Sequence, residues 1–156
     1  MLENYVVLDL TDERGEIGPM LLGDLGADVI RIETIRGSSA RRCGPFMKNA
    51  AKDMQSLQFI AFNRNKRSIV LDPTTTEGKT DLQELIRRAD FIFVSAPRAE
   101  VDQLSISFEE TCSINPRIVY VKISPFGHDG PHAGLSSNDL VIAALAGPVS
   151  LQGIPD

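Results

Sequence analysis

The sequence has 156 residues, a length that most often forms one domain with a sizeable hydrophobic core. Hydrophobic residues make up 42% of it and charged residues 24%, which is ordinary for a globular protein. The formal net charge of −5 argues against a general nucleic-acid binder, for which a basic excess is typical. No apolar stretch approaches the ~18 residues of a membrane span, and residues 1–4 lack the basic start of a signal peptide. These features predict a cytoplasmic protein that binds neither nucleic acid nor membrane.

The cysteines and histidines do not form a recognisable metal-ligand pattern. Cys43 and Cys112 lie far apart, as expected for reduced thiols in the cytoplasm. His128 and His132 are four residues apart, but the glycines and the proline around them oppose a helix that would align them. We therefore expect an exposed histidine pair and no metal site.

The first third of the chain predicts two strands separated by a helix. Residues 6–10 are a short apolar run with β-branched residues, which favours a strand, and residues 28–33 predict a second strand. Residues 18–25 are small and apolar, and they predict a helix that returns over the first strand. Residues 34–53 show no periodicity and form a long loop, which in a compact domain is usually functional or mobile. After Ser56, apolar residues again fall at helical spacing.

The middle of the chain continues the alternation of strand and helix. Residues 68–71 predict a third strand, which ends before Pro73 because proline cannot donate to the sheet. The three threonines at 74–76 offer an N-cap for a helix over residues 77–89. The uninterrupted apolar run at 91–94 is typical of a strand covered on both faces.

The last third carries a helix-start signal of its own. Ser107 and Glu110 have the spacing of a capping box and predict a short helix that ends near residue 115. The remaining elements expected are a strand over residues 118–123, a loop over 125–136 and a helix from Ser137 to about Ala146. Alternating strands and helices predict parallel pairing with right-handed crossovers. The expected fold class is therefore α/β, Rossmann-like, with a mostly parallel five-stranded sheet flanked by helices.

Few residues stand out as binding candidates from spacing alone. Gly23 and Gly26 fall at the end of a predicted helix instead of the turn that opens it, so a helix C-cap is favoured over a dinucleotide fingerprint. The cationic segment 63–67 is either a solvated connection or a phosphate contact, and Arg41 and Arg42 leave the same two interpretations open.

One acidic residue is a candidate for chemistry. Asp139 follows Ser137 at a helix start, where a carboxylate is usually a capping group favoured by the helix dipole. A general acid or base role would need a partner that spacing does not supply.

Several segments, in this order and at this spacing, resemble one known family. They are residues 7–11, 21–33, 63–72, 76–78, 114–120, 124–127, 130–131, 139–141 and 153–156. Together they resemble family III CoA-transferases of the CaiB/BaiF type, which include formyl-CoA transferase, carnitine CoA-transferase and α-methylacyl-CoA racemase. The resemblance implies that residues 1–156 are the amino-terminal part of a Rossmann-type, CoA-binding large domain.

The resemblance also implies a reaction. In the family an aspartate attacks an acyl-CoA and an enzyme–CoA thioester follows, so coenzyme A is a substrate and no tightly bound cofactor is needed. The nucleophilic aspartate is expected beyond Asp156, which leaves Asp139 a distant second candidate. A racemase-like fragment is disfavoured, because Asn138 stands where the racemase histidine would precede Asp139.

Matched positions define a candidate CoA site within the family pattern. They are Glu16, Ile17, Arg42, Leu71, Asp72, Thr74, Ser95, Ala96 and Pro97. Thr74 stands where the family often has lysine, and Gln103 where it often has arginine. Each loss removes a charge-assisted contact of roughly 1.5–3 kcal/mol, so we expect weak binding of CoA or acyl-CoA.

The family assembles as an interlocked homodimer, whose topology needs more chain than residues 1–156. The resemblance therefore predicts a chain that cannot form that dimer and is inactive alone. Self-association, or a partner chain that supplies the missing half, is expected in its place. The alternative function is a degenerate, non-enzymatic interaction subunit.

Overall fold

A computed structural model describes residues 1–50, 55–127 and 129–152. The chain divides into two compact units, Met1–Ile123 and Ser124–Asp156. Within the described residues, no helix is both long and apolar enough to cross a membrane.

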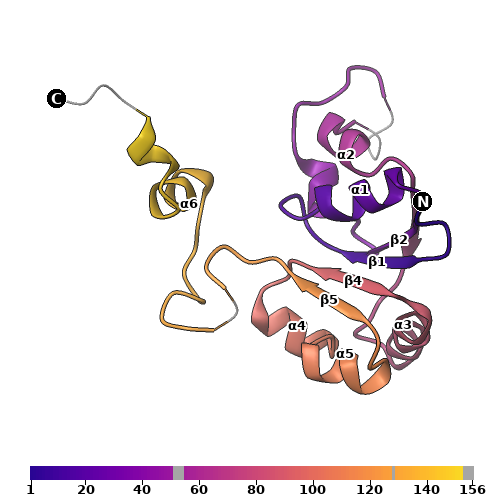
Figure 1. The fold of residues 1–156 in the computed structure, drawn as a ribbon. Helices are drawn as coiled ribbons and strands as arrows, with labels where there is room; N and C mark the ends of the chain where they lie inside the picture. Colours follow the sequence, from indigo (N-terminus) through magenta and orange to yellow (C-terminus); the bar gives the residue numbers. More distant parts are fainter. Residues whose placement is uncertain (51–54, 128, 153–156) are drawn as a thin grey trace. The chain divides into compact units, whose positions relative to one another are not determined.

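The first unit is built on a five-stranded sheet in which every neighbouring pair is parallel (Figure 1). The strands are β1 Val6–Leu10, β2 Asp28–Glu33, β3 Lys66–Val70, β4 Phe91–Val94 and β5 Val119–Lys122. Their order across the sheet is β3-β2-β1-β4-β5, so β1 lies at the centre with Leu8 opposite Ile30 on one side and Ile92 on the other. The predicted α/β class with a five-stranded parallel sheet is confirmed.

Helices cover both faces of this sheet. They are α1 Ile17–Asp24, the 3₁₀ helix η1 Ser39–Arg42, α2 Leu57–Phe62, α3 Thr76–Arg88, α4 Arg98–Leu104 and α5 Phe108–Ile114. Helices α1 and α2 lie on one face, and α3, α4 and α5 lie on the other (Figure 1). The predicted capping box opens α5, where the Ser107 and Glu110 side chains each pair with the other's backbone N–H.

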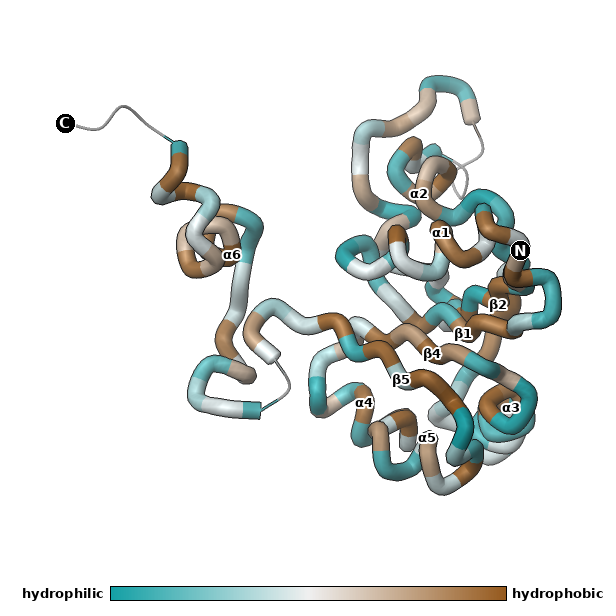
Figure 2. Tube along the Cα trace, viewed as in Figure 1, coloured by the Kyte–Doolittle hydropathy of each residue, from teal (hydrophilic) through white to brown (hydrophobic). Residues whose placement is uncertain are grey.

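The core forms because successive strand residues point to opposite faces. Val7 and Leu8 of β1 are both fully buried, one in each of two hydrophobic clusters. Leu8 packs with Leu82 and Ile86 of α3, whereas Val7 packs with Phe93 on the α1 side. Figure 2 shows the corresponding hydrophobic bands along β1, β4 and β5. Each such side chain contributes roughly 1.5–3 kcal/mol on burial.

The structure corrects several expected boundaries. The third strand begins at Lys66 instead of Ser68, because Lys66 pairs in register with Val29 and buries its amine. Helix α4 was not predicted, since its seven residues bury only Val101 and show little apolar periodicity. The loop expected over residues 34–53 contains η1, and residues 51–53 lie outside the described part.

The first helix ends as its glycine predicts. Gly26 has a φ of 103°, and the Ala27 N–H donates to the Leu22 carbonyl. This left-handed glycine closes the helix and redirects the chain into β2, so it is a C-cap and not part of a dinucleotide fingerprint.

The second unit contains α6 Asp139–Leu145 and the 3₁₀ helix η3 Pro148–Leu151. The helix cap expected at Ser137 is instead Asn138, whose side chain accepts a hydrogen bond from the Val141 N–H at 3.0 Å. Asn138 has the extended backbone of an N-cap, which places its oxygen over the first turn. Neither α6 nor η3 has a buried residue.

Candidate functional site

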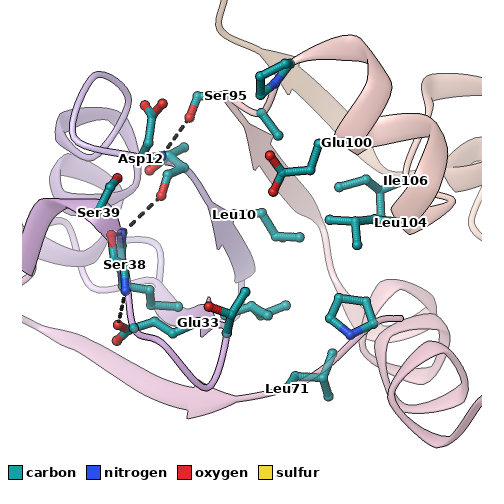
Figure 3. A pocket seen from close by; sticks show the side chains of 18 residues that line it. Leu10, Asp12, Glu33, Ser38, Ser39, Leu71, Ser95, Glu100, Leu104 and Ile106 are labelled. Carbon is teal, nitrogen blue, oxygen red and sulfur yellow. Dashed lines mark hydrogen bonds between the residues drawn. The ribbon is translucent and has the colours of Figure 1, made fainter. Parts of the chain in front are cut away.

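A pocket of 320 Å³ opens at the carboxyl ends of the central strands of the first unit (Figure 3). Strand β1 is followed along the chain by β2 on one side, and β4 pairs with it on the other. The strand order therefore reverses at β1, and in open α/β sheets ligands bind at such a switch point. The lining residues are Leu10, Thr11, Asp12, Arg31, Ile32, Glu33, Thr34, Gly37, Ser38, Ser39, Leu71, Pro73, Ser95, Ala96, Pro97, Glu100, Leu104 and Ile106.

The pocket has a polar side and an apolar side. Figure 3 shows Ser38 and Ser39 on one side, Leu104 and Ile106 on the opposite side, and Leu10 between them. Hydroxyl groups on one wall and aliphatic side chains on the other suit a flat ligand group with polar substituents. The volume lies at the small end of the range of about 300–1,000 Å³ for ligand pockets, so it suits one part of a large ligand.

The segment after β1 is tied to the end of β4. The Asp12 N–H donates to Ser95 Oγ at 2.7 Å, and Arg14 Nε donates to the Asp12 carboxylate at 2.9 Å. Burial opposes ionisation of Asp12, but hydrogen bonding with Arg14 and Ser95 keeps its pKa below the ordinary value. This part of the rim therefore holds an ionised Asp12 paired with Arg14 and is locally fixed.

Glu33 is the last residue of β2, and both oxygens of its carboxylate accept hydrogen bonds. It accepts hydrogen bonds from Arg41 at 2.7 Å, from Ser68 Oγ at 2.6 Å and from the Ser38 N–H at 2.9 Å. Burial alone would raise its pKa, but these donors lower the pKa to about 2. The Arg41 guanidinium also lies 3.9 Å from the centre of the Phe59 ring. Glu33 thus holds the loop after β2 in place.

Beneath the pocket lies a cluster of buried charges. Arg31 pairs with Asp9 and with Glu16 at 2.9 Å each, and Lys66 pairs with Asp9 at 2.8 Å. Burial raises the pKa of Glu16, although Asn63 donates to it at 2.8 Å, and burial lowers the pKa of Lys66. Two cations and two carboxylates are thus paired with one another in the interior.

Four of the sequence-predicted site residues line the pocket: Leu71, Ser95, Ala96 and Pro97. Ser95 is buried and bonded to Asp12, and the Ala96 carbonyl accepts from Lys122 Nζ at 2.5 Å. These positions hold the β4 side of the pocket.

The other predicted site residues do not line it. The Glu16 side chain is 1% exposed and its Oε1 pairs with Arg31 and Asn63, so the carboxylate is buried away from a ligand. Ile17 is exposed on α1. Asp72 accepts from the Thr74 N–H and hydroxyl at 3.0 and 2.6 Å, which lowers the Asp72 pKa. Arg42 donates at 3.3 and 3.4 Å to loop carbonyls beside the pocket.

The cationic segment 63–67 contains two exposed arginines and one buried lysine. Arg64 pairs with Asp24 and Arg67 with Asp28, both exposed pairs at the surface. The Lys66 side chain is 1% exposed, so both sequence interpretations are wrong for this residue. Its role depends on the distant Asp9, which the local sequence does not reveal.

Sequence reasoning missed the strand-end residues of the pocket. Leu10, Ile32 and Glu33 lie where β1 and β2 end, and the unpredicted α4 contributes Glu100 and Leu104. The available signal was topological, because carboxyl ends of parallel strands converge at one edge of the sheet.

The structure gives no support to the remaining chemical candidates. Asp139 lies in the first turn of α6 and starts that helix beside its cap. His132 is exposed, whereas His128 lies outside the described residues. Across residues 1–50, 55–127 and 129–152, no three His, Cys, Asp or Glu side chains are grouped to hold a metal ion.

Comparison with known proteins assigns the family. Residues 2–156 match the family described as CoA-transferase family III. The chain is 38% identical to formyl-CoA:oxalate CoA-transferase of Streptomyces avermitilis over 156 residues, covering 99% of this chain and 37% of that protein. It is 34% identical to a succinyl-CoA:(R)-benzylsuccinate CoA-transferase subunit of Thauera aromatica, covering 96% of this chain and 37% of that subunit. The chain belongs to CoA-transferase family III.

Solved structures agree with this assignment. A CAIB/BAIF family protein from Brucella suis superposes with a TM-score of 0.86 at 34% identity, over 99% of this chain and 41% of that one. Rv3272 from Mycobacterium tuberculosis gives a TM-score of 0.80 at 31% identity, over 100% of this chain and 42% of that one. The chain thus spans about two fifths of the length of these relatives.

Proposed function

We propose that this chain is the coenzyme A-binding portion of an acyl-CoA:carboxylate CoA-transferase. The observation that carries the proposal is the pocket at the strand-order reversal, in a chain that belongs to CoA-transferase family III. Curated relatives are transferases that move CoA between carboxylic acids, among them formyl-CoA:oxalate CoA-transferase. CoA is a substrate in this proposal, and a cytoplasmic location is part of it.

The pocket suits the nucleoside end of CoA better than its phosphates. Leu71, Leu104 and Ile106 supply an apolar wall for a flat base, and Thr11 and Ser38 supply oxygens for sugar hydroxyls. The phosphates have weaker support, because Thr74 stands in place of the family lysine and its hydroxyl is bonded to Asp72. We therefore expect an affinity weaker than ~1 mM, since association must first overcome several kcal/mol of lost freedom.

Calorimetric titration with CoA tests the binding half of the proposal. The variant Ala96→Trp fills the pocket and should abolish the weak binding heat, whereas Ala133→Trp, in an exposed loop of the second unit, should leave it unchanged. Equal binding by both variants would place the CoA site elsewhere.

We further propose that the chain transfers nothing by itself, because no carboxylate within residues 1–156 matches the family nucleophile. An acyl-exchange assay with acyl-CoA and a free acid should show no turnover. Measurable transfer would contradict this and would make Asp139 the first residue to replace. The interaction-subunit alternative predicts no CoA binding and a stable complex with another chain.

A further inference from the structure

Arg31 joins several segments of the first unit from a position beneath the pocket. It lies on β2, and its side chain is 2% exposed. Nη1 donates to Asp9 Oδ2 on β1 at 2.9 Å, and Nη2 pairs with Glu16 Oε1 at the start of α1 at 2.9 Å. The guanidinium therefore connects two strands and a helix start.

Two further contacts of Arg31 reach two different loops that line the pocket. Nη2 donates to the Thr11 carbonyl at 3.1 Å and to Ser38 Oγ at 2.6 Å. Thr11 follows β1, and Ser38 caps η1 through the Ala40 N–H, so the two residues belong to separate loops. Both line the pocket, as does Arg31 itself. One nitrogen atom thus ties two loops that bound the same pocket.

Stability alone does not explain a buried arginine here. Replacing a buried ion pair with well-packed apolar residues is often neutral or stabilising, because desolvation offsets the attraction between the charges. What a guanidinium adds is a planar set of donors in fixed directions, which a lysine amine does not reproduce. The contacts of Arg31 use this property to fix Thr11 and Ser38 together.

We propose that Arg31 is a positioning residue that holds the loops of Thr11 and Ser38 at a fixed separation and so sets the shape of the nucleoside pocket. The identity of the ligand rests on the proposed function, whereas the clamp itself does not. Arg31 acts through these loops, since its charge is already neutralised by Asp9 and Glu16.

Lys66 offers a matched comparison within the same charge cluster. Its side chain is 1% exposed, and it donates to Asp9 Oδ2 at 2.8 Å, to the Glu16 carbonyl at 3.0 Å and to Asn63 Oδ1 at 3.1 Å. Neither Lys66 nor these three partners line the pocket. Removing Lys66 therefore perturbs the cluster but leaves the hydrogen bonds of Arg31 to Thr11 and Ser38 in place.

The test compares Arg31→Lys, Ser38→Ala and Lys66→Met by amide hydrogen exchange and by CoA titration. Arg31→Lys keeps the buried positive charge, and Ser38→Ala changes no charge, so both should fold. In Arg31→Lys and in Ser38→Ala, the amide exchange rate of residues 36–40 should rise at least tenfold. In residues 11–12 the same rise is expected for Arg31→Lys alone. Both variants should bind CoA at least fivefold more weakly than the parent chain. Lys66→Met should raise exchange near residues 63–66 and leave CoA affinity within twofold.

If amide exchange in residues 11–12 and 36–40 is unchanged in Arg31→Lys, the proposal is overturned. An equal rise in exchange at those residues in Lys66→Met would also overturn it. If the parent chain shows no CoA binding at concentrations well above ~1 mM, the proposed function fails. The exchange pattern still decides the role of Arg31 in that case, because it needs no ligand.

Discussion

Glu33 shows how a single residue orders the edge of the pocket. Its folded-state pKa of about 2 lies below the ordinary 4.5, so ionised Glu33 stabilises the folded chain. That stabilisation is complete above about pH 4.5 and is lost as the pH falls toward 2. The carboxylate thereby couples β2, β3 and η1 through Ser68 and Arg41.

The variant Glu33→Gln tests this directly. It should lower the free energy of unfolding at pH 7 by roughly 1–3 kcal/mol, because Arg41 loses its charged partner. Denaturant unfolding followed by circular dichroism should also show a shallower loss of stability between pH 4.5 and 2 than in the parent chain. Identical slopes for the two proteins would mean that Glu33 does not carry this dependence.

Thr74 provides a second residue-scale prediction. Thr74→Lys restores the charge that relatives of this type often have at the phosphate position, and it should strengthen CoA binding about three- to tenfold. Thr80→Lys adds the same charge on α3, after the turn that contains Thr74, and is the matched control. A similar increase in CoA affinity in both variants would indicate general electrostatic attraction instead of a phosphate contact.

At the scale of elements, the turn between β3 and α3 depends on close backbone packing. A Cβ added at Gly78 would lie 1.9 Å from the Asp72 carbonyl oxygen, so Gly78→Ala requires the turn and the helix to separate. We expect a loss of about 2–4 kcal/mol in unfolding free energy by thermal or denaturant melting. Gly134→Ala, with no atom within 4 Å of the new Cβ, should change it by less than about 0.5 kcal/mol. Equal stability of the two variants would contradict this packing.

Elements with local signals were predictable, whereas contacts between distant elements were not. The runs at 6–10, 28–33 and 91–94 matched observed strands, because short runs rich in β-branched and other apolar residues favour strands. The role of Lys66 was missed since its partner Asp9 is 57 residues away. Pocket residues such as Leu104 and Ile106 came from α4 and the segment after it, whose weak apolar pattern gives little warning of a helix.

At the scale of the whole molecule, the second unit presents uncovered apolar side chains. Leu135, Leu140, Leu145 and Leu151 are between 56% and 88% exposed. Exposed apolar groups of this kind favour association, and we propose that the chain self-associates. Light scattering should show an average mass that rises with concentration, and Leu140→Glu with Leu145→Glu should reduce that rise. A constant monomer mass at high concentration would oppose this prediction.

The central claim is that CoA binds at the carboxyl ends of β1, β2 and β4, and an NMR titration of the chain with CoA tests it most directly. Amide signals of residues 11–12, 37–39, 71 and 95–96 should shift together along one saturable curve with a midpoint in the millimolar range. Signals from α5 and from the second unit should stay in place. Absence of shifts at the pocket, or a saturable response confined to other residues, would contradict the account.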